Sequence, residues 1–170
     1  MLNGSMDCIV LSGRIQKGRG VAIRQLDWLE KKFHEALGKP PFPGTLNLLL
    51  DNPVVFAGET GSSIGNRLFV PARIPNVGGV LLHRWRGCPL HVVEVIAAVS
   101  IREALGEGDG EVVSLEVCQS DLVDPTWAQK LFHCLLWCGR RTWFYSNHWY
   151  SGLRVVRAIR HYFGQQVSAS

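Results

Sequence analysis

The sequence lacks the features that would place the chain in a membrane or in a disulfide framework. It has no apolar run of the roughly 20 residues that a helix needs to span a bilayer. Its first residues lack the charged and apolar regions of a signal peptide. Its five cysteines have no paired spacing, which is typical of a reducing compartment. We therefore expect a cytoplasmic protein, and its 170 residues are enough to bury a hydrophobic core.

Net charge is absent from the first two thirds of the chain and concentrated at the C-terminal end. Residues 1–117 carry twelve Lys and Arg against twelve Asp and Glu, whereas residues 118–170 carry six against two and hold the whole net charge of +4. Ten of the sixteen aromatic residues also lie after residue 117. Such a change in composition marks a boundary. We predict one domain over residues 8–117 and a basic, aromatic-rich helical extension over residues 118–170.

Helical patterns are few before residue 118. Only residues 25–37 convincingly show apolar side chains at helical spacing. Residues 58–66, rich in Gly and Ser, read as a loop. Several short runs bounded by turn residues predict strands, at residues 8–12, 45–48, 54–56, 68–74 and 80–83. We therefore expect a mainly β (α+β) fold, a small β-barrel with one inserted helix.

One stretch carries the most specific chemical signal, Pro-Phe-Pro-Gly-Thr-Leu-Asn-Leu at residues 41–48. Its prolines exclude helix and hold the backbone extended, and Gly44 ends this rigid approach. Because side chains alternate along a strand, Thr45 and Asn47 point the same way. A hydroxyl and a carboxamide oxygen suit a hard cation such as Mg²⁺, which prefers oxygen ligands. The alternative is a polar face on an edge strand.

A second signal is the glycine-rich, basic loop that follows the first strand. Gly18 and Gly20 free the backbone there, while Lys17 and Arg19 supply positive charge. Such a loop can cradle phosphates with its N–H groups. It is not a Walker A loop, because Gly-Lys-Ser/Thr is missing. The alternative is a hairpin with a solvated basic tip.

A third signal is Glu94, which lies inside a strongly apolar run at residues 91–101. An unpaired carboxylate in such a run would be costly to bury. Glu94 therefore points outward, has a cationic partner or binds a ligand, and the pattern alone does not separate these.

The three segments together resemble the archaeal-type, CTP-dependent riboflavin kinases, over roughly residues 9–117. Pro-Phe-Pro-Gly-Thr-Leu-Asn resembles the family's Pro-Tyr-x-Gly-Thr-Leu-Asn. The glycine-rich loop matches the family's Gly-x-Val-x-Ser-Gly-x-Gly-x-Gly at Gly13, Ile15, Gly18 and Gly20. The third segment matches the family's Glu-x-Ile-Ala-Pro-x-x-Leu-Arg-Glu at Glu94, Ile96, Ala97, Ile101, Arg102 and Glu103. Residues 109–112 match the Asp-Gly-Asp/Glu-Val that follows in the family.

The resemblance implies a cradle-loop-type, six-stranded β-barrel that transfers the γ-phosphoryl group of CTP to riboflavin, giving flavin mononucleotide. It implies Mg²⁺ as cofactor, held by Thr45 and Asn47, and a flavin contact at Glu94. Implied nucleotide contacts are the loop Lys17, Gly18, Arg19, Gly20, Val21 and Ala22, and the segment Val99, Ser100, Ile101 and Arg102. It indicates no general base, so the catalytic residue stays unassigned.

The chain departs from the family pattern at several positions. Lys17 replaces a Ser, Ala22 a Gly and Ala98 a Pro. Arg86 stands about where the family has a Thr that helps to hold the flavin phosphate, so we count Arg86 among the flavin-binding residues. Arg84 and Arg86 can hold a phosphate as ionised forks, or they can indicate a different acceptor.

The C-terminal extension does not belong to this pattern. Asp124, as N-cap, followed by Pro125 predicts a helix that ends at Cys138, with its apolar face formed by Trp127, Leu131, Cys134, Leu135 and Cys138. Cys134 and Cys138, taken with His133 and Cys118, match the spacing of no common zinc module. We therefore expect these cysteines to act as small buried hydrophobic residues. A second helix is expected at residues 151–163, with three arginines in one row. We expect the extension to pack on the barrel or on a second copy of the chain, or to lie on an anionic membrane surface. Nucleic acid is the less favoured partner.

Two other functions remain open from the sequence. One is a CTP-dependent kinase of another small alcohol, which the changes at Arg86 and Ala98 allow. The other is a non-catalytic nucleotide- or nucleic-acid-binding regulatory module, since related barrels bind DNA. Retention of both Thr45 and Asn47 argues against this second alternative, because a DNA-binding barrel does not need them.

Overall fold

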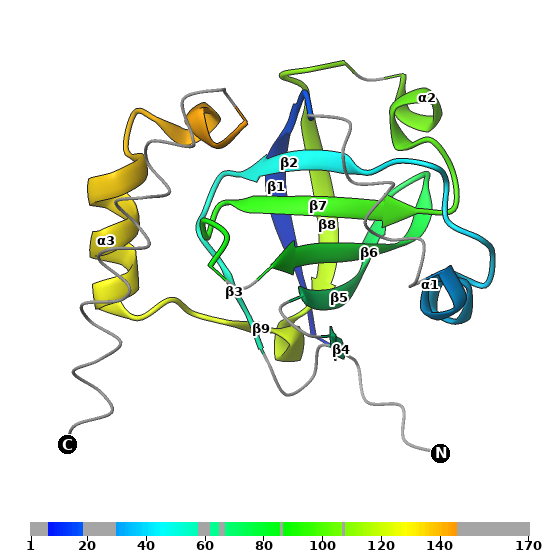
Figure 1. Ribbon diagram of the computed structural model, residues 1–170, viewed down its shortest axis with the longest axis horizontal. Coiled ribbons are helices and arrows are strands. Elements are labelled where there is room, and N and C mark those ends of the chain that lie inside the picture. The colour runs from blue at the N-terminus through cyan, green and yellow to red at the C-terminus, as the bar shows by residue number, and fades with distance from the viewer. Residues whose placement is uncertain are drawn as a thin grey trace.

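Six antiparallel strands form a closed barrel (Figure 1). The computed structural model describes residues 7–18, 30–57, 62–64, 67–85, 87–106 and 108–145. The strands follow one another around the barrel in the order β5-β6-β7-β2-β1-β8, and a short β5–β8 ladder closes it. They are β1 (Cys8–Gln16), β2 (Leu46–Leu50), β5 (Arg67–Ile74), β6 (Gly78–Trp85), β7 (Val92–Ala97) and β8 (Val112–Cys118).

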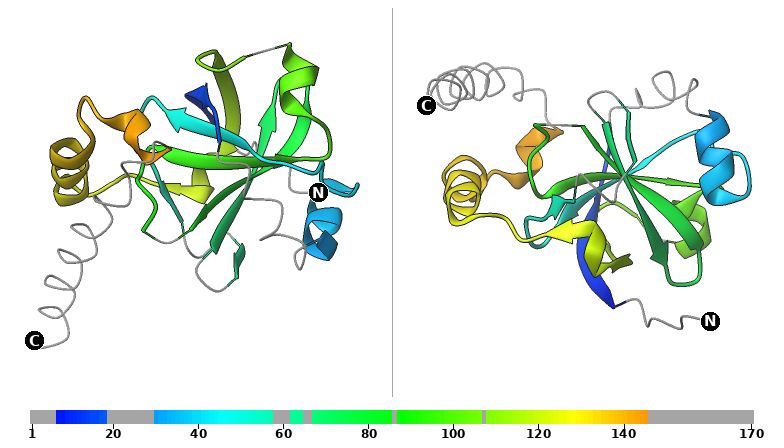
Figure 2. Two further views of the ribbon diagram at one scale, coloured as in Figure 1. Left: turned by 45° about the horizontal axis from the view of Figure 1, so that its top comes forward. Right: turned by 90° about the horizontal axis from the view of Figure 1, so that it is seen from below.

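Shorter elements decorate this barrel. Strand β4 (Ser62–Ile64) extends the sheet beside β5, and β3 (Val55–Phe56) pairs with β9 (Leu122–Val123). The helices are α1 (Glu30–Leu37), α2 (Ile101–Leu105) and α3 (Trp127–Trp137), with 3₁₀ turns at Gln119–Asp121 and Arg141–Phe144. Helices α1 and α3 lie at opposite sides of the barrel (Figures 1 and 2).

The barrel interior holds the main hydrophobic core, because alternate residues of each strand point inward. On β2 these are Leu46, Leu48 and Leu50, and they meet Val93 and Val95 of β7. All five residues of β2 are nonetheless buried, since the outer face of this strand is covered as well. The apolar run in β2 is therefore explained by burial on both faces.

Outside the barrel, α1 and α3 cover two separate parts of the same sheet face. Under α1, Phe33 packs with Phe69, Leu81 and Ile96. Under α3, Trp137 packs on a patch formed by Leu49, Cys88 and Val92. The sheet between these two apolar patches carries polar side chains, and this is where the candidate site lies.

The predicted mainly β fold with a six-stranded barrel is confirmed. The expected inserted helix is α1, and the five-residue helix α2 was not predicted. The expected loop at residues 58–66 was wrong in part, because Ser62–Ile64 forms β4 by pairing with β5. The predicted helix 25–37 is observed at Glu30–Leu37, and residues 25–29 lie outside the described residues.

The helix of the extension differs from the prediction at its start. Helix α3 begins at Trp127, and its N-cap is Thr126 in place of Asp124. Thr126 Oγ1 accepts a hydrogen bond from the Gln129 N–H, and Gln129 Oε1 accepts one from the Thr126 N–H. This reciprocal capping box satisfies two donors, which an Asp124 cap would not do.

The buried side of α3 also differs from the prediction. Trp137 is buried against the barrel, whereas Trp127, Leu131 and Leu135 are exposed. Cys134 and Cys138 are exposed too, so they are not the small buried hydrophobes that we expected. The reason is that the patch of Leu49, Cys88 and Val92 receives the large indole of Trp137, which faces away from the predicted stripe.

The second predicted helix, residues 151–163, lies outside the described residues. The pairing of β9 with β3 and the packing of Trp137 join the described part of the extension to the barrel. The boundary at residues 117 and 118 stays a prediction, as do the expected partners of the extension. No helix in the described part of the chain has the length and hydropathy needed to cross a bilayer. All five cysteines are described, and each is a free thiol.

Candidate active site

A row of side chains crosses the outer face of the barrel between α1 and α3. Antiparallel register places Gln16 opposite Asn47, Asn47 opposite Glu94, and Glu94 opposite His83. Phe69 continues the row on β5. Directly opposed side chains on neighbouring strands are in contact range, so Asn47, Glu94 and His83 form one polar strip across β2, β7 and β6.

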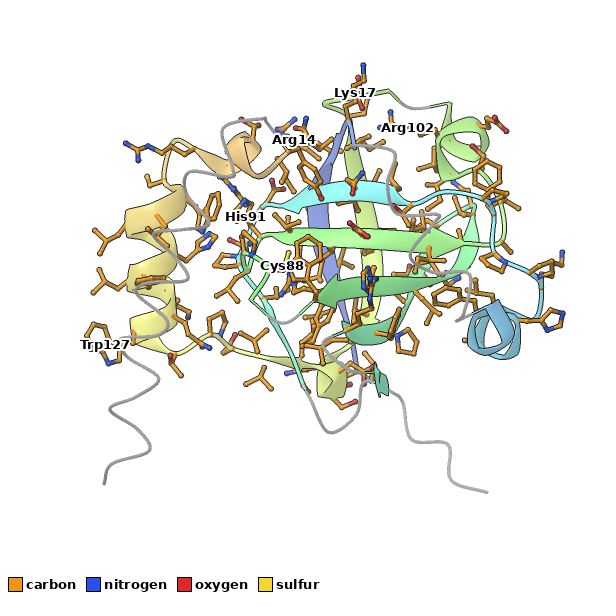
Figure 3. All side chains as sticks on the ribbon, in the orientation of Figure 1. Arg14, Lys17, Cys88, His91, Arg102 and Trp127 are labelled. Carbon is orange, nitrogen blue, oxygen red and sulfur yellow. The ribbon has the colours of Figure 1, made fainter. Side chains whose placement is uncertain are left out.

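The glycine-rich loop begins directly over Asn47. A Cβ at position 18 would collide with Nδ2 of Asn47 and lie 3.2 Å from its Cγ. Asn47 is only 8% exposed. The start of the predicted phosphate loop and the predicted metal ligand therefore meet, although 29 positions separate them in the sequence. Lys17 is exposed at this edge of the barrel (Figure 3), whereas Arg19, Gly20, Val21 and Ala22 lie outside the described residues.

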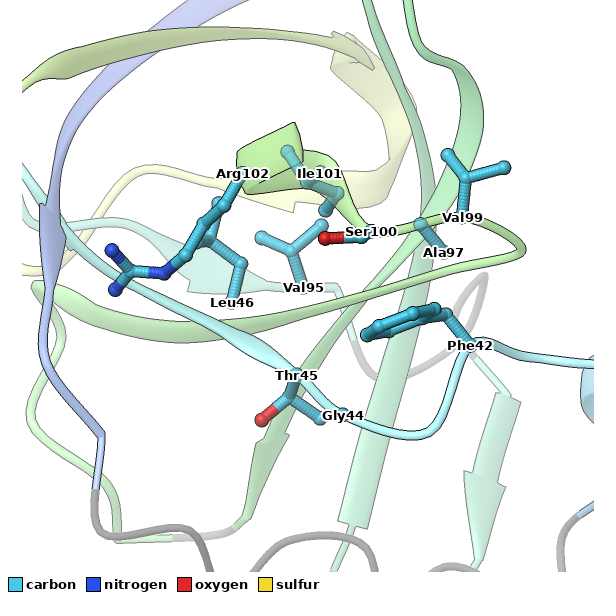
Figure 4. A pocket seen from close by; sticks show the side chains of 10 residues that line it. All are labelled: Phe42, Gly44, Thr45, Leu46, Val95, Ala97, Val99, Ser100, Ile101 and Arg102. Atoms are coloured by element: carbon cyan, nitrogen blue, oxygen red, sulfur yellow. The ribbon is translucent and has the colours of Figure 1, made fainter. Parts of the chain in front are cut away.

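The predicted nucleotide segment forms part of a neighbouring pocket where β2 and β7 meet α2. The pocket has a volume of about 70 Å³ and includes Thr45 and all four predicted residues. It is lined by Phe42, Gly44, Thr45, Leu46, Val95, Ala97, Val99, Ser100, Ile101 and Arg102 (Figure 4). The structure thus brings Thr45, a predicted metal ligand, and the predicted nucleotide segment to one pocket.

The side chains of this segment have different environments. Val99 is exposed, whereas Ile101 is buried in the barrel core. Ser100 is the N-cap of α2, where its hydroxyl accepts a hydrogen bond from the Glu103 N–H. Arg102 forms an ion pair of 2.6 Å with Asp109. Ser100 and Ile101 therefore shape the backbone of the pocket wall, whereas the side chains of Val99 and Arg102 are exposed to solvent.

Thr45 connects the pocket with the polar strip. Its side chain points away from the side of β2 on which Leu46, Val95 and Arg102 gather (Figure 4). Thr45 comes just before β2, and Asn47 is the second residue of that strand. That their side chains face the same way stays a prediction from the alternation of an extended chain.

The sequence reasoning missed Phe42, which forms one wall of the pocket. The Phe42 N–H donates to the Ala97 carbonyl oxygen at 2.7 Å, which ties the proline-rich approach to the end of β7. The ring is partly exposed and offers an apolar face to a planar ligand. Its place between two prolines, two residues before Gly44, was the available signal.

Glu94 points outward from the barrel and has a basic partner. Its Oε2 lies 3.1 Å from Nδ1 of His83, and the Glu94 side chain is 15% exposed. The sequence reasoning did not assign a role to His83. Nothing in a single sequence shows which residue of one strand faces Glu94 on the next, so the register was needed to find it.

Arg84, which we had considered as a phosphate ligand, has another role. Its guanidinium donates to the carbonyl oxygens of Val92, Val54 and Leu90 at 2.9, 2.6 and 2.9 Å. It also lies 4.6 Å from the centre of the Phe56 ring. Burial lowers the pKa of Arg84 to about 10. These donors are used within the fold, so the phosphate role of Arg84 was wrong, and Arg86 lies outside the described residues.

The described residues contain no group of three or more His, Cys, Asp or Glu that could hold a metal ion. Thr45 and Asn47 are a different donor set, a hydroxyl just before β2 and an amide on that strand. Hard cations accept such neutral oxygens together with waters and ligand phosphates, so these two residues fit Mg²⁺.

No protein-family profile matches the chain. Among curated proteins, the chain is 33% identical over 119 residues to a riboflavin kinase of Methanocella arvoryzae, covering 62% of this chain and 56% of that protein. It is 32% identical over 127 residues to a riboflavin kinase of Ignicoccus hospitalis, covering 64% and 71%. It is 32% identical over 105 residues to one of Methanothermobacter thermautotrophicus, covering 54% and 83%. The match thus extends over about half of the first relative's length and over more of the two others.

Proposed function

Because the chain belongs to the riboflavin kinase family, we propose that it transfers the γ-phosphoryl group of CTP to riboflavin, giving flavin mononucleotide and CDP. The observation that carries this proposal is the meeting of three distant segments. Gly18 lies on Asn47, Asn47 is the cross-strand partner of Glu94, and Thr45 lines the pocket of the Val99–Arg102 segment. A protein that served only as a scaffold would not need these three at one place.

The reaction breaks the bond between the γ-phosphorus and its bridging oxygen in CTP. A new bond forms between that phosphorus and the 5′-oxygen of the ribityl chain, and the hydroxyl proton is released. Such transfers depend mainly on positioning and on charge neutralisation. A small site without an assigned general base is therefore sufficient, and we assign none.

We assign the donor phosphates to the side of the site where the glycine-rich loop begins. The backbone at Gly18 runs so close to Asn47 that phosphates held by the loop would lie near the Thr45 and Asn47 oxygens. Thr45 and Asn47 would hold Mg²⁺, which when bound neutralises charge on the phosphates. Lys17 is exposed at the same edge and adds positive charge.

We assign the cytosine nucleotide to the pocket between Phe42 and the Val99–Arg102 segment. Phe42 offers a ring for stacking, and the backbone from Val99 to Ile101 offers hydrogen-bonding groups in a fixed geometry. The Ser100 cap and the buried Ile101 keep this backbone rigid. A rigid backbone edge suits the recognition of one base among four.

We assign the riboflavin acceptor to the polar strip at Glu94. The side chain lies next to Asn47 in the row, so an acceptor held there would be close to the donor phosphates. The changes at Arg86 and Ala98 leave a kinase of another small alcohol as the second candidate. The expected cytoplasmic location and the partners of the extension stay predictions.

The test is to incubate the protein with Mg²⁺, riboflavin and each of CTP, ATP, GTP and UTP, and to measure flavin mononucleotide by chromatography with fluorescence detection. We expect product with CTP at a rate at least tenfold above the other nucleotides, about 1.4 kcal/mol of discrimination. Equal rates with CTP and ATP would overturn the donor assignment alone. No product with any nucleotide would overturn the riboflavin kinase assignment.

A further inference from the structure

His83 is the most deeply buried member of the polar strip, with 1% of its side chain exposed. It lies on β6, on the outer face of the barrel, opposite Glu94 on one side and Phe69 on the other. An imidazole has two polar nitrogens, and leaving either without a partner in a buried place is costly. The partners of the two nitrogens therefore show what the residue does.

Both nitrogens have partners, and together these partners fix the tautomer. Nε2 lies 3.4 Å from Nη1 of Arg67, and Nδ1 lies 3.1 Å from Oε2 of Glu94. A guanidinium has only donors, so Nε2 must accept from Arg67. The proton of the neutral ring then sits on Nδ1, which donates to the Glu94 carboxylate.

The plane of the His83 ring is fixed as well. The ring stacks on Phe69 with centroids 5.0 Å apart and planes 26° apart. Phe69 in turn meets the edge of Phe33 on α1, at 5.7 Å and 63°. Aromatic contacts of this kind restrict ring rotation, so the donor Nδ1–H has one direction.

The consequence falls on Glu94. One of its oxygens is held by a buried donor of fixed direction, which restricts the side chain to one rotamer. A carboxylate accepts at both oxygens, so Glu94 can still take a hydrogen bond from a ligand. We propose that His83 is a positioning residue that sets the affinity for the riboflavin acceptor by holding the Glu94 carboxylate toward it, and that it takes no part in binding the nucleotide. This inference rests on the proposed function.

The test compares three variants with the wild type. His83→Phe keeps a flat ring on Phe69 but removes both nitrogens. His83→Asn places an amide N–H close to the position of Nδ1 and so restores the donor to Glu94. His34→Phe, at an exposed histidine of α1, is the control. Riboflavin binding is measured by quenching of flavin fluorescence, CTP binding by titration calorimetry without riboflavin, and folding by thermal melting.

We expect His83→Phe to raise the Kd for riboflavin at least tenfold while the Kd for CTP stays within twofold of the wild type. His83→Asn should bring the riboflavin Kd back to within about threefold. Adding His83→Phe to a Glu94→Gln variant should cause little further loss, because the histidine acts through the carboxylate. If His83 had a purely structural role, His83→Phe would instead raise the Kd values for riboflavin and CTP together. His83→Asn would then not restore either of them.

Three results would overturn the inference. His83→Phe with an unchanged riboflavin Kd would overturn it while the proposed function stands. Equal losses for riboflavin and CTP, with no rescue by Asn, would show a structural role. Wild-type protein that binds CTP but not riboflavin would overturn both this inference and the riboflavin acceptor.

Discussion

Gly18 lies directly against the side-chain amide of Asn47. The glycine-rich loop begins so close to β2 that a Cβ at position 18 would collide with Nδ2 and lie 3.2 Å from Cγ. Asn47 is almost fully buried and cannot swing away freely. The absence of a side chain at position 18 therefore lets the loop and the proposed metal ligand occupy one site.

Gly18→Ala should impair kinase activity without unfolding the protein. The new methyl group has to push the Asn47 side chain out of its place, and an error of about 1 Å in such a site can lower the rate on the order of a hundredfold. We expect a loss of that order in kcat/KM for flavin mononucleotide formation, in a protein that still melts cooperatively. Gly79→Ala is the matched control, since a Cβ there meets nothing within 4 Å. Equal activity of both variants would contradict the close approach.

Trp137→Ala should destabilise the protein strongly. The indole is 8% exposed and fills the patch of Leu49, Cys88 and Val92 on the outside of the barrel. Its removal leaves a cavity, which typically costs about 3–5 kcal/mol of unfolding free energy. Trp127→Ala on the same helix is the control, because Trp127 is 76% exposed and should change stability by about 0.5 kcal/mol or less. Urea denaturation of both variants checks this, and equal effects would show that α3 does not dock through Trp137.

The unfolding free energy should decrease as the pH is lowered, because of His91. Burial lowers the pKa of His91 to about 4, below the 6.5 of an exposed histidine. The neutral ring donates from Nε2 to the Arg141 carbonyl oxygen at 3.1 Å. The unfolded chain takes up a proton near pH 6.5 and the folded chain only near pH 4, so the unfolding free energy decreases as the pH falls through this window. The loss from His91 is about 3 kcal/mol.

His133 strengthens the same dependence. Its ring lies 4.9 Å from that of His91, and burial lowers its pKa as well. Urea denaturation at pH 7.5, 6.0 and 4.5 measures the total. His91→Gln, which can still donate to Arg141, should flatten the dependence, and His34→Gln on the surface should leave it unchanged. A slope that His91→Gln does not alter would contradict the assignment.

The pattern of single strands was readable from the sequence because it depends on neighbouring residues. Alternation predicts that Thr45 and Asn47 face the same way, and the prolines before them predict the extended approach. The burial of β2 on both faces was not readable, since it depends on α3, a helix more than 75 positions later. The start of α3 was missed because Asp124 and Thr126 are both good N-caps, and the contact with Gln129 decides between them.

The composition of the polar strip could not be predicted, because it depends on the register between paired strands. The place of His83 opposite Glu94 follows from the pairing of β6 with β7, and Arg84, one position later, faces the opposite way. Arg84 looked like a phosphate ligand because it is basic and near the matched segment. Its three carbonyl partners come from residues 54, 90 and 92, and no local pattern shows that their oxygens converge.

Asn47 is the residue on which the account depends most. Leu in its place keeps the volume and the strand but removes the amide oxygen that would hold Mg²⁺. Loss of one preorganised electrostatic group typically costs about 2–4 kcal/mol in the transition state. That is roughly a thirty- to thousandfold loss of rate. Thr45→Val should behave similarly, and the double variant should lose less than the sum because the two residues act as a unit.

The most direct measurement is the initial rate of flavin mononucleotide formation by the wild type and Asn47→Leu over a series of Mg²⁺ concentrations, with CTP and riboflavin fixed. The account predicts that Asn47→Leu melts at the wild-type temperature, loses most of its rate and needs more Mg²⁺ for half its maximal rate. A folded Asn47→Leu protein with the wild-type rate at limiting Mg²⁺ would contradict it.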